Sequence, residues 1–153
     1  MLYCKAIFGR NLSVKQGGSL SVFCFVDEVL EVKKNESLTA SFTLRGDEEF
    51  LQDHFDGFPV MPGVLLLESL KQAASKLLEF SEVFKTAFFR LAAAEEVKFG
   101  QFVKPGNNLK IFVKLLKREE TFVFLEGRID LVSETASPKK ALTANFVLTP
   151  VEI

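Results

Sequence analysis

Two segments near the start of the chain carry strand-like patterns. β-Branched and aromatic residues dominate Ser21–Val32, while polar and apolar residues alternate along Glu36–Arg45. Both patterns are typical of β-strands. The Lys-Lys-Asn-Glu sequence between them is a turn signal, because asparagine tolerates unusual backbone angles, so we predict a hairpin. The polar segment that follows, Gly46–Gly57, is expected to be a loop with one helical turn around Glu48–His54.

A helical pattern follows Pro62, which suits the first helical position because proline has no N–H to leave unsatisfied. Apolar residues then recur at spacings of three and four along one side of a helix of about sixteen residues. The first turns are apolar all round, so we expect the N-terminal end of this helix to be buried and the part near Lys71, Lys76 and Glu79 to be more exposed. The residues in the apolar register are Leu67, Leu70, Ala74, Leu77 and Leu78.

Four further strand-like segments follow the helix, at Lys85–Phe99, Asn108–Lys117, Thr121–Val132 and Ala141–Thr149. Sequential strands with short links favour an antiparallel sheet, and a helix this apolar has to be covered by the sheet. The sequence therefore predicts an α+β fold, with an antiparallel sheet of about six strands wrapped around one long central helix. A length of 153 residues suits a single domain over 1–153.

Composition and charge restrict the partners of the chain. A formal net charge of -1 gives no field that would attract nucleic acid. No window reaches the roughly 18 to 20 uncharged apolar residues that a membrane span needs, and Lys5 interrupts the start before a secretory apolar region can form. We expect a cytoplasmic protein with no nucleic-acid partner and no membrane span. The 17 phenylalanines favour core filling over an acyl pocket.

The cysteines and the single histidine do not form a recognisable metal site. Cys4 and Cys24 make no Cys-x-x-Cys pair, and with only one histidine they supply no metal cluster. We therefore predict no metal ion, and we expect both cysteines to be reduced.

Candidate chemistry is concentrated between His54 and Glu68. His54 titrates near pH 6.5 when unperturbed and can accept a proton at cellular pH, although a lone histidine is more often a surface residue. Glu68 lies about 9 Å along the helix from Pro62 at 1.5 Å per residue, too deep to act on the helix dipole. Its carboxyl is either buried without a partner and able to donate a proton, or part of a solvated stripe.

The Pro62-Gly63 pair supplies a third feature at the start of the helix. The free N–H groups of a first helical turn attract negative charge, and glycine lets a substrate oxygen approach the backbone. A base, a potential acid and an oxyanion site close together in sequence indicate an enzyme that abstracts a proton.

The segment around these residues resembles the active-site segment of FabZ-type β-hydroxyacyl-[acyl-carrier-protein] dehydratases, which reads approximately GHFPxxPVMPGVLxxEAxAQ. Two flanking segments, FVDEVLEV at 25–32 and VKFGQFVKPGNNL at 97–109, are similar to further parts of that family. The resemblance therefore extends over residues 22–149. Within the central segment the matching residues are His54, Phe55, Pro59–Leu65, Glu68 and Gln72.

The resemblance implies a hotdog fold and an activity. Family members convert R-3-hydroxyacyl thioesters on acyl carrier protein to trans-2-enoyl thioesters, and need no metal or organic cofactor because the thioester already acidifies the α-carbon. They form dimers in which the histidine of one subunit meets the glutamate of the other, and three such dimers often assemble into a hexamer.

Carried over residue by residue, the resemblance makes His54 the base and Glu68 of the partner subunit the group that protonates or orients the departing hydroxyl. The N–H of Gly63, with that of Val64, would hold the thioester oxygen. Pro62, Val64 and Phe99 become candidate substrate-binding residues, although packing explains them almost as well.

Several departures from the family leave alternatives open. Asp53 and Asp56 replace a glycine and a proline, and Gly100-Gln101-Phe102 stands where two cations are common. Contact with an acidic carrier protein would then fall to Lys98 and Lys104. A hotdog-fold thioesterase is one alternative, because such hydrolases also use a carboxylate near the central helix. A non-catalytic acyl-thioester-binding module is another, if the aspartates misalign the site.

Overall fold

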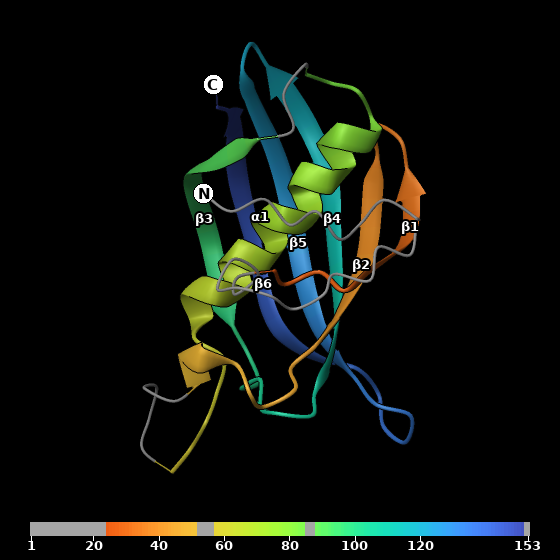
Figure 1. The fold of residues 1–153 in the computed structure, drawn as a ribbon. Helices are drawn as coiled ribbons and strands as arrows, with labels where there is room; N and C mark the ends of the chain where they lie inside the picture. The colour runs from red at the N-terminus through yellow and green to blue at the C-terminus, as the bar shows by residue number, and fades with distance from the viewer. Residues whose placement is uncertain (1–23, 52–56, 85–87, 152–153) are drawn as a thin grey trace, which may run out of the picture.

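A six-stranded antiparallel sheet curves around one long helix in the computed structural model, which describes residues 24–51, 57–84 and 88–151 (Figure 1). The strand order is β1-β2-β4-β5-β6-β3, so β1 and β3 form the two edges. The elements are β1 (Glu28–Lys33), β2 (Ser37–Thr43), the 3-10 helix η1 (Glu49–Leu51), α1 (Gly63–Phe80), β3 (Phe89–Phe99), β4 (Asn108–Glu119), β5 (Phe122–Val132) and β6 (Lys139–Pro150).

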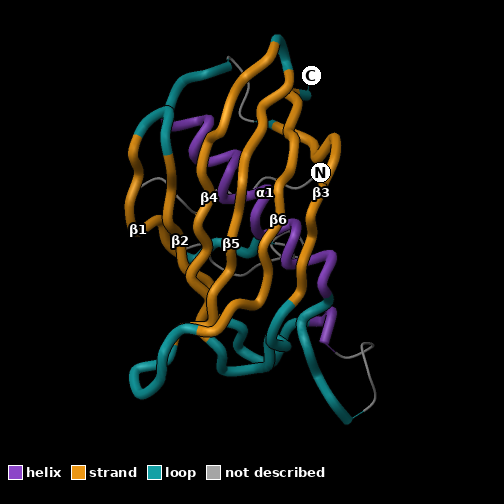
Figure 2. The backbone as a smooth tube through the Cα atoms, turned by 180° about the vertical axis from the view of Figure 1, so that it is seen from behind, coloured by secondary structure: helices purple, strands orange, loops and turns teal. Residues whose placement is uncertain are grey.

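The predicted strands and helix are confirmed, although β1 begins at Glu28 and not at Ser21, and the other ends shift by a few residues. β1 and β2 pair antiparallel, and Asn35 takes a φ of 61° in the turn between them, a left-handed backbone that asparagine tolerates better than most residues. The predicted helical turn before His54 corresponds to η1. Seen from behind, the strands lie in front of most of α1, and the start of the helix reaches beyond β3 (Figure 2).

The helix packs closely on the centre of the sheet. Leu66, Leu70, Ala74 and Leu77 are buried, whereas Leu67 is half-buried. Gly127 on β5 permits the approach, because a Cβ atom there would lie 2.7 Å from Cδ2 of Leu70. The apolar stripe read from the sequence is therefore the face that meets the sheet.

The expected gradient of burial along the helix is wrong. Val64, in the first turn, is 69% exposed, whereas Lys76 is buried. The spacing of apolar residues indicates which side of the helix faces the core. It does not indicate which turns of the helix the sheet covers, because that depends on where the strands lie. Lys76 buries its aliphatic stem with its ammonium group 3.5 Å from Glu79, as long cationic side chains often do. No helix in the described ranges is long and apolar enough to cross a membrane.

The segment before β1 leaves the sheet and packs against α1. Phe25 and Val26 are buried there, although the sequence predicted that the strand already includes them. Cys24 is disulfide-bonded, which contradicts the expectation of reduced cysteines. The distance between cysteines in a fold decides whether they pair, and a separation along the sequence does not give that distance. Cys4, the other cysteine of the chain, lies outside the described residues.

Candidate active site

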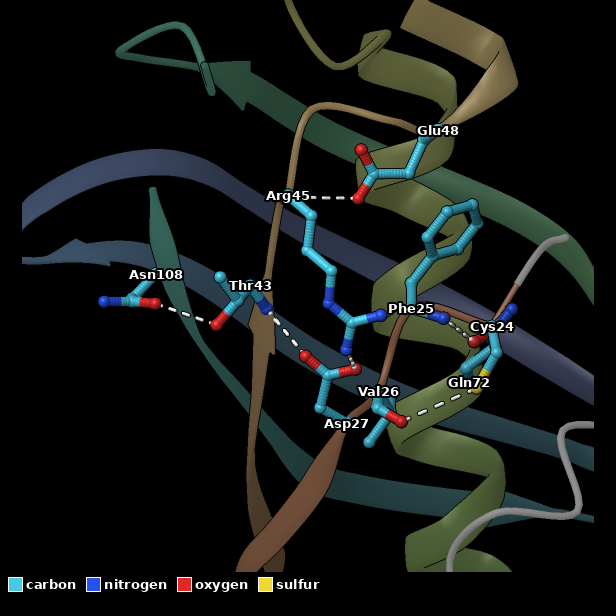
Figure 3. A network of polar contacts seen from close by, with 9 residues as sticks. All are labelled: Cys24, Phe25, Val26, Asp27, Thr43, Arg45, Glu48, Gln72 and Asn108. Carbon is cyan, nitrogen blue, oxygen red and sulfur yellow. Dashed lines mark hydrogen bonds and ion pairs between the residues drawn. The ribbon is translucent and has the colours of Figure 1, made fainter. Parts of the chain in front are cut away.

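The loop that carries His54 lies partly outside the described residues, and His54 itself is among those not described. Hydrogen bonds hold the described segments on both sides of this loop. The Glu48 carboxylate accepts hydrogen bonds from the N–H groups of Arg45 (2.8 Å) and Gly46 (2.7 Å), and Figure 3 shows the contact with Arg45. On the far side, the N–H of Met61 donates to the carbonyl of Val103 (2.8 Å). The loop therefore leaves and rejoins the fold next to the start of α1.

Unpaired backbone donors mark the start of α1. Pro62 is the N-cap residue, with φ -58° and ψ 140° and no side-chain cap. Its carbonyl accepts hydrogen bonds from Leu65 (3.0 Å) and Leu66 (3.3 Å). Within the described part of the chain, the N–H groups of Gly63 and Val64 have no acceptor. Two adjacent donors at the positive end of a helix form a site for an oxygen that carries negative charge.

Phe99 lies directly against this helix start. A Cβ atom built on Gly63 would stand 2.7 Å from Cε1 and 2.9 Å from Cζ of the Phe99 ring, so only glycine leaves the ring in its present place. Phe99 is the last residue of β3 and is 57% exposed. Figure 1 shows the end of β3 beside the start of α1. The structure thus brings together Pro62, Gly63 and Phe99, with Val64 exposed beside them.

Two more exposed phenylalanines lie on the segments that flank the helix start. Phe58 and Phe102 meet edge to face, with ring centroids 5.9 Å apart, and Nζ of Lys104 lies 5.1 Å from the Phe58 centroid. Together with Phe99 they form what we call the aromatic rim. The sequence interpretation overlooked Phe58 and Phe102, although an exposed aromatic residue within a Gly-rich or Pro-rich turn is a usable signal for binding.

Glu68 has partners, which neither alternative read from the sequence anticipated. Its side chain is 33% exposed, and Oε1 lies 3.1 Å from Nζ of Lys71. The same oxygen accepts a hydrogen bond from Nε2 of Gln72 (3.3 Å). Gln72 is held in turn by the N–H of Phe25, which donates to its Oε1 (2.8 Å; Figure 3). The carboxyl is thus neither isolated in the core nor freely solvated.

Glu68 and the helix start face different sides of α1. Glu68 follows Gly63 by five residues, which at about 100° per residue places their Cα positions about 140° apart around the axis. The same five residues separate them by about 7.5 Å along the axis.

Metal ligands do not gather in the part of the chain that the structure describes, where no three His, Cys, Asp or Glu residues come close enough to hold an ion.

Comparison with known proteins identifies the family. A model of the ApeI-like proteins, described as ApeI dehydratase, matches residues 30–135. The chain belongs to this dehydratase family. The 3-hydroxyacyl-[acyl-carrier-protein] dehydratase FabZ of Polynucleobacter necessarius is 41% identical over 124 residues, or 81% of this chain and 80% of that protein. FabZ of Levilactobacillus brevis is 45% identical over 94 residues, which span 61% of this chain and just under two thirds (64%) of that protein.

The fold agrees with a solved structure of the same kind. A chain of the dehydratase heterocomplex ApeI:P from Xenorhabdus doucetiae superposes with a TM-score of 0.67 at 18% identity, over 86% of each chain. The predicted hotdog fold, an α+β arrangement of an antiparallel sheet around one helix, is therefore confirmed for this ApeI-like chain.

Proposed function

We propose that this chain dehydrates R-3-hydroxyacyl thioesters, carried on acyl carrier protein, to trans-2-enoyl thioesters. Membership of a dehydratase family supports the reaction type. The observation that carries the proposal is the open helix start, where two unpaired N–H groups and a glycine stand beside the exposed ring of Phe99. A thioester oxygen fits that arrangement, because it gains negative charge when the α-proton leaves.

The proposed reaction uses three groups. His54 takes the proton from the α-carbon, and the N–H groups of Gly63 and Val64 stabilise the resulting enolate oxygen. The enolate electron pair then expels the β-hydroxyl as water. The proton that this oxygen needs comes from the Glu68 carboxyl of the partner subunit, or from the protonated His54 while Glu68 orients the hydroxyl. One oxyanion donor typically contributes about a hundred- to a thousandfold in rate, and acid or base assistance about a hundred- to ten-thousandfold. No cofactor is needed for these steps.

A shared site between two subunits is part of the proposal. The separation of Glu68 from the helix start, about 7.5 Å along α1 and about 140° around it, supports it. The edge strand β3 supports it as well, because Leu91, Ala92, Ala93 and Ala94 are exposed along it. An exposed apolar stretch on an edge strand pairs readily with another strand, so a second copy paired along 91–94 would extend the sheet. We propose a homodimer, alone or as one of three in a hexamer.

The proposed carrier protein would approach along the aromatic rim. Lys104 lies at the rim, over the ring of Phe58, and it is the better of the two candidate cations. Lys98 instead lines a separate hollow of about 270 Å³ together with Glu96, Glu126 and Arg128, so it is not part of the aromatic rim. A cytoplasmic location remains a prediction from the sequence.

A direct assay tests the proposed reaction. Purified protein is given 3-hydroxyacyl thioesters of several chain lengths, on carrier protein and on coenzyme A, while the absorbance of the enoyl thioester is followed. We expect turnover, and we expect His54→Ala to lower kcat by about a hundred- to ten-thousandfold while the protein stays folded by circular dichroism. Full activity in His54→Ala would contradict the mechanism. Release of free thiol would instead indicate a thioesterase, and ligand binding without turnover at any chain length would indicate a binding module.

A further inference from the structure

Lys71 contacts the Glu68 carboxyl but has no role in the reaction proposed above. It follows Glu68 by three residues on α1, its Nζ lies 3.1 Å from Oε1 of Glu68, and its side chain is only 12% exposed. We propose, on the basis of the proposed function, that Lys71 is a positioning residue that holds the Glu68 carboxyl in place for the departing hydroxyl.

Both contacts on the carboxyl converge on one oxygen. Nζ of Lys71 and Nε2 of Gln72 both reach Oε1, while Oε2 of Glu68 receives no hydrogen bond or ion pair from any described residue. The Gln72 side chain is itself held in place, because its Oε1 accepts a hydrogen bond of 2.8 Å from the N–H of Phe25. Oε1 is thus the anchored oxygen, and Oε2 is the one left for the substrate.

Anchoring matters because a glutamate side chain has three rotatable torsions. A glutamate that is one-third exposed and has no partner populates several rotamers. Substrate binding would have to restrict it to one rotamer, which costs conformational entropy. A misplacement of about 1 Å in a reacting group can cost about a hundredfold in rate. An ammonium group held close to the helix surface removes that freedom before the substrate arrives.

The same helix supplies a matched control. Lys76 and Glu79 have the same spacing, with Nζ 3.5 Å from Oε2, and their side chains are also largely buried. This second pair is part of no proposed site, so the loss of Lys76 reports what a largely buried lysine of α1 contributes to the fold. Pairs of this spacing stabilise a helix only slightly, and replacing a largely buried charge with an apolar side chain of similar volume is often tolerated.

The test compares Lys71→Met, Lys71→Arg and Lys76→Met in the full chain, with the thioester that the wild type dehydrates fastest. We expect Lys71→Met to lower kcat by about tenfold to a hundredfold with KM nearly unchanged, because the carboxyl is displaced but the acyl site is intact. Lys71→Arg keeps a cation at the same place and should recover most of the rate. Lys76→Met should retain the wild-type kcat. Lys71→Gln serves the same purpose if the methionine variant does not fold.

A double-mutant cycle decides whether Lys71 acts through Glu68. In a Glu68→Gln background, Lys71→Met should cause no further loss of kcat, since the group it positions is already gone. Equal losses from Lys71→Met and Lys76→Met, or a Lys71→Met loss that persists in full in the Glu68→Gln background, would overturn the proposal. A wild-type chain that does not dehydrate any substrate would overturn the proposed function itself, so the two failures are distinguishable.

Discussion

The substitution Gly63→Ala tests whether the start of α1 holds the thioester oxygen. The added methyl group would stand 2.7 Å from Cε1 and 2.9 Å from Cζ of Phe99. Ordinary van der Waals contact begins near 3.4 Å, so the ring and the methyl group have to separate by about 0.7 Å along the shorter contact. The ring of Phe99 is more than half exposed and can swing outward, but the methyl group then occupies the space above the free N–H groups.

The expected effect on stability is small. Replacing glycine with alanine gains about 0.5–1 kcal/mol in the interior of a helix, which is an upper limit at this first helical position, and the displaced ring loses part of its contact with the helix. The free energy of unfolding should therefore change by less than about 1 kcal/mol, or roughly 2–4 °C in Tm for a domain of this size.

The expected effect on catalysis is large. Oxyanion donors act at about 2.7–3.1 Å from the oxygen, and a displacement of about 1 Å costs about a hundredfold. A hundredfold loss in kcat/KM corresponds to about 2.7 kcal/mol of transition-state stabilisation. Activity should therefore fall far more than stability.

The assay measures kcat/KM and thermal unfolding for Gly63→Ala, Phe99→Ala and the double variant at one protein concentration. Removing the ring relieves the close contact, so the double variant should be less impaired than the product of the two single losses. Wild-type kcat/KM in a folded Gly63→Ala protein would refute an oxyanion role for the helix start. Losses that multiply would show that the contact with Phe99 is not the cause.

Two further predictions concern the scaffold. Gly127→Ala should lower the free energy of unfolding by about 1–3 kcal/mol, because the new Cβ would lie 2.7 Å from Cδ2 of Leu70 and 3.0 Å from Cε1 of Phe146 in the core. Thermal melts measure this loss of stability, and kcat below the unfolding transition should be retained. An unchanged Tm would contradict the close packing of Gly127. Ala93→Asp on the exposed edge of β3 should separate the subunits and abolish activity; light scattering after gel filtration reports the mass, and an active variant of unchanged mass would exclude that edge as the interface.

The architecture was predictable because local patterns determine it. Six strand-like segments with turn signals between them gave the sheet, and Pro62 placed the start of the helix within one residue of its observed position. Asn35 marked the first hairpin turn, as its positive φ confirms. Strand order and register required the structure, because several orders of the six strands satisfy the same alternation of apolar and polar residues.

The environment of single residues was less predictable. The exposure of Val64 and the burial of Lys76 depend on which length of helix the sheet covers, and this length is a property of the whole fold. The partners of Glu68 were partly predictable, since Lys71 and Gln72 follow it by three and four residues and therefore lie beside it on a helix. That their donors converge on one oxygen depends on rotamers, which a pattern does not specify.

Phe99 links the proposed assembly to the proposed chemistry. It is the last residue of the exposed edge strand β3, and its ring rests on Gly63 where the unpaired donors lie. A second copy paired along β3 would thus fix Phe99 against the helix start and bring its own Glu68 towards the same place. A separated subunit would keep the donors but lose the carboxyl. For this reason, dissociation should lower kcat rather than raise KM, whereas a monomer with full kcat would show that Glu68 acts within its own chain or not at all.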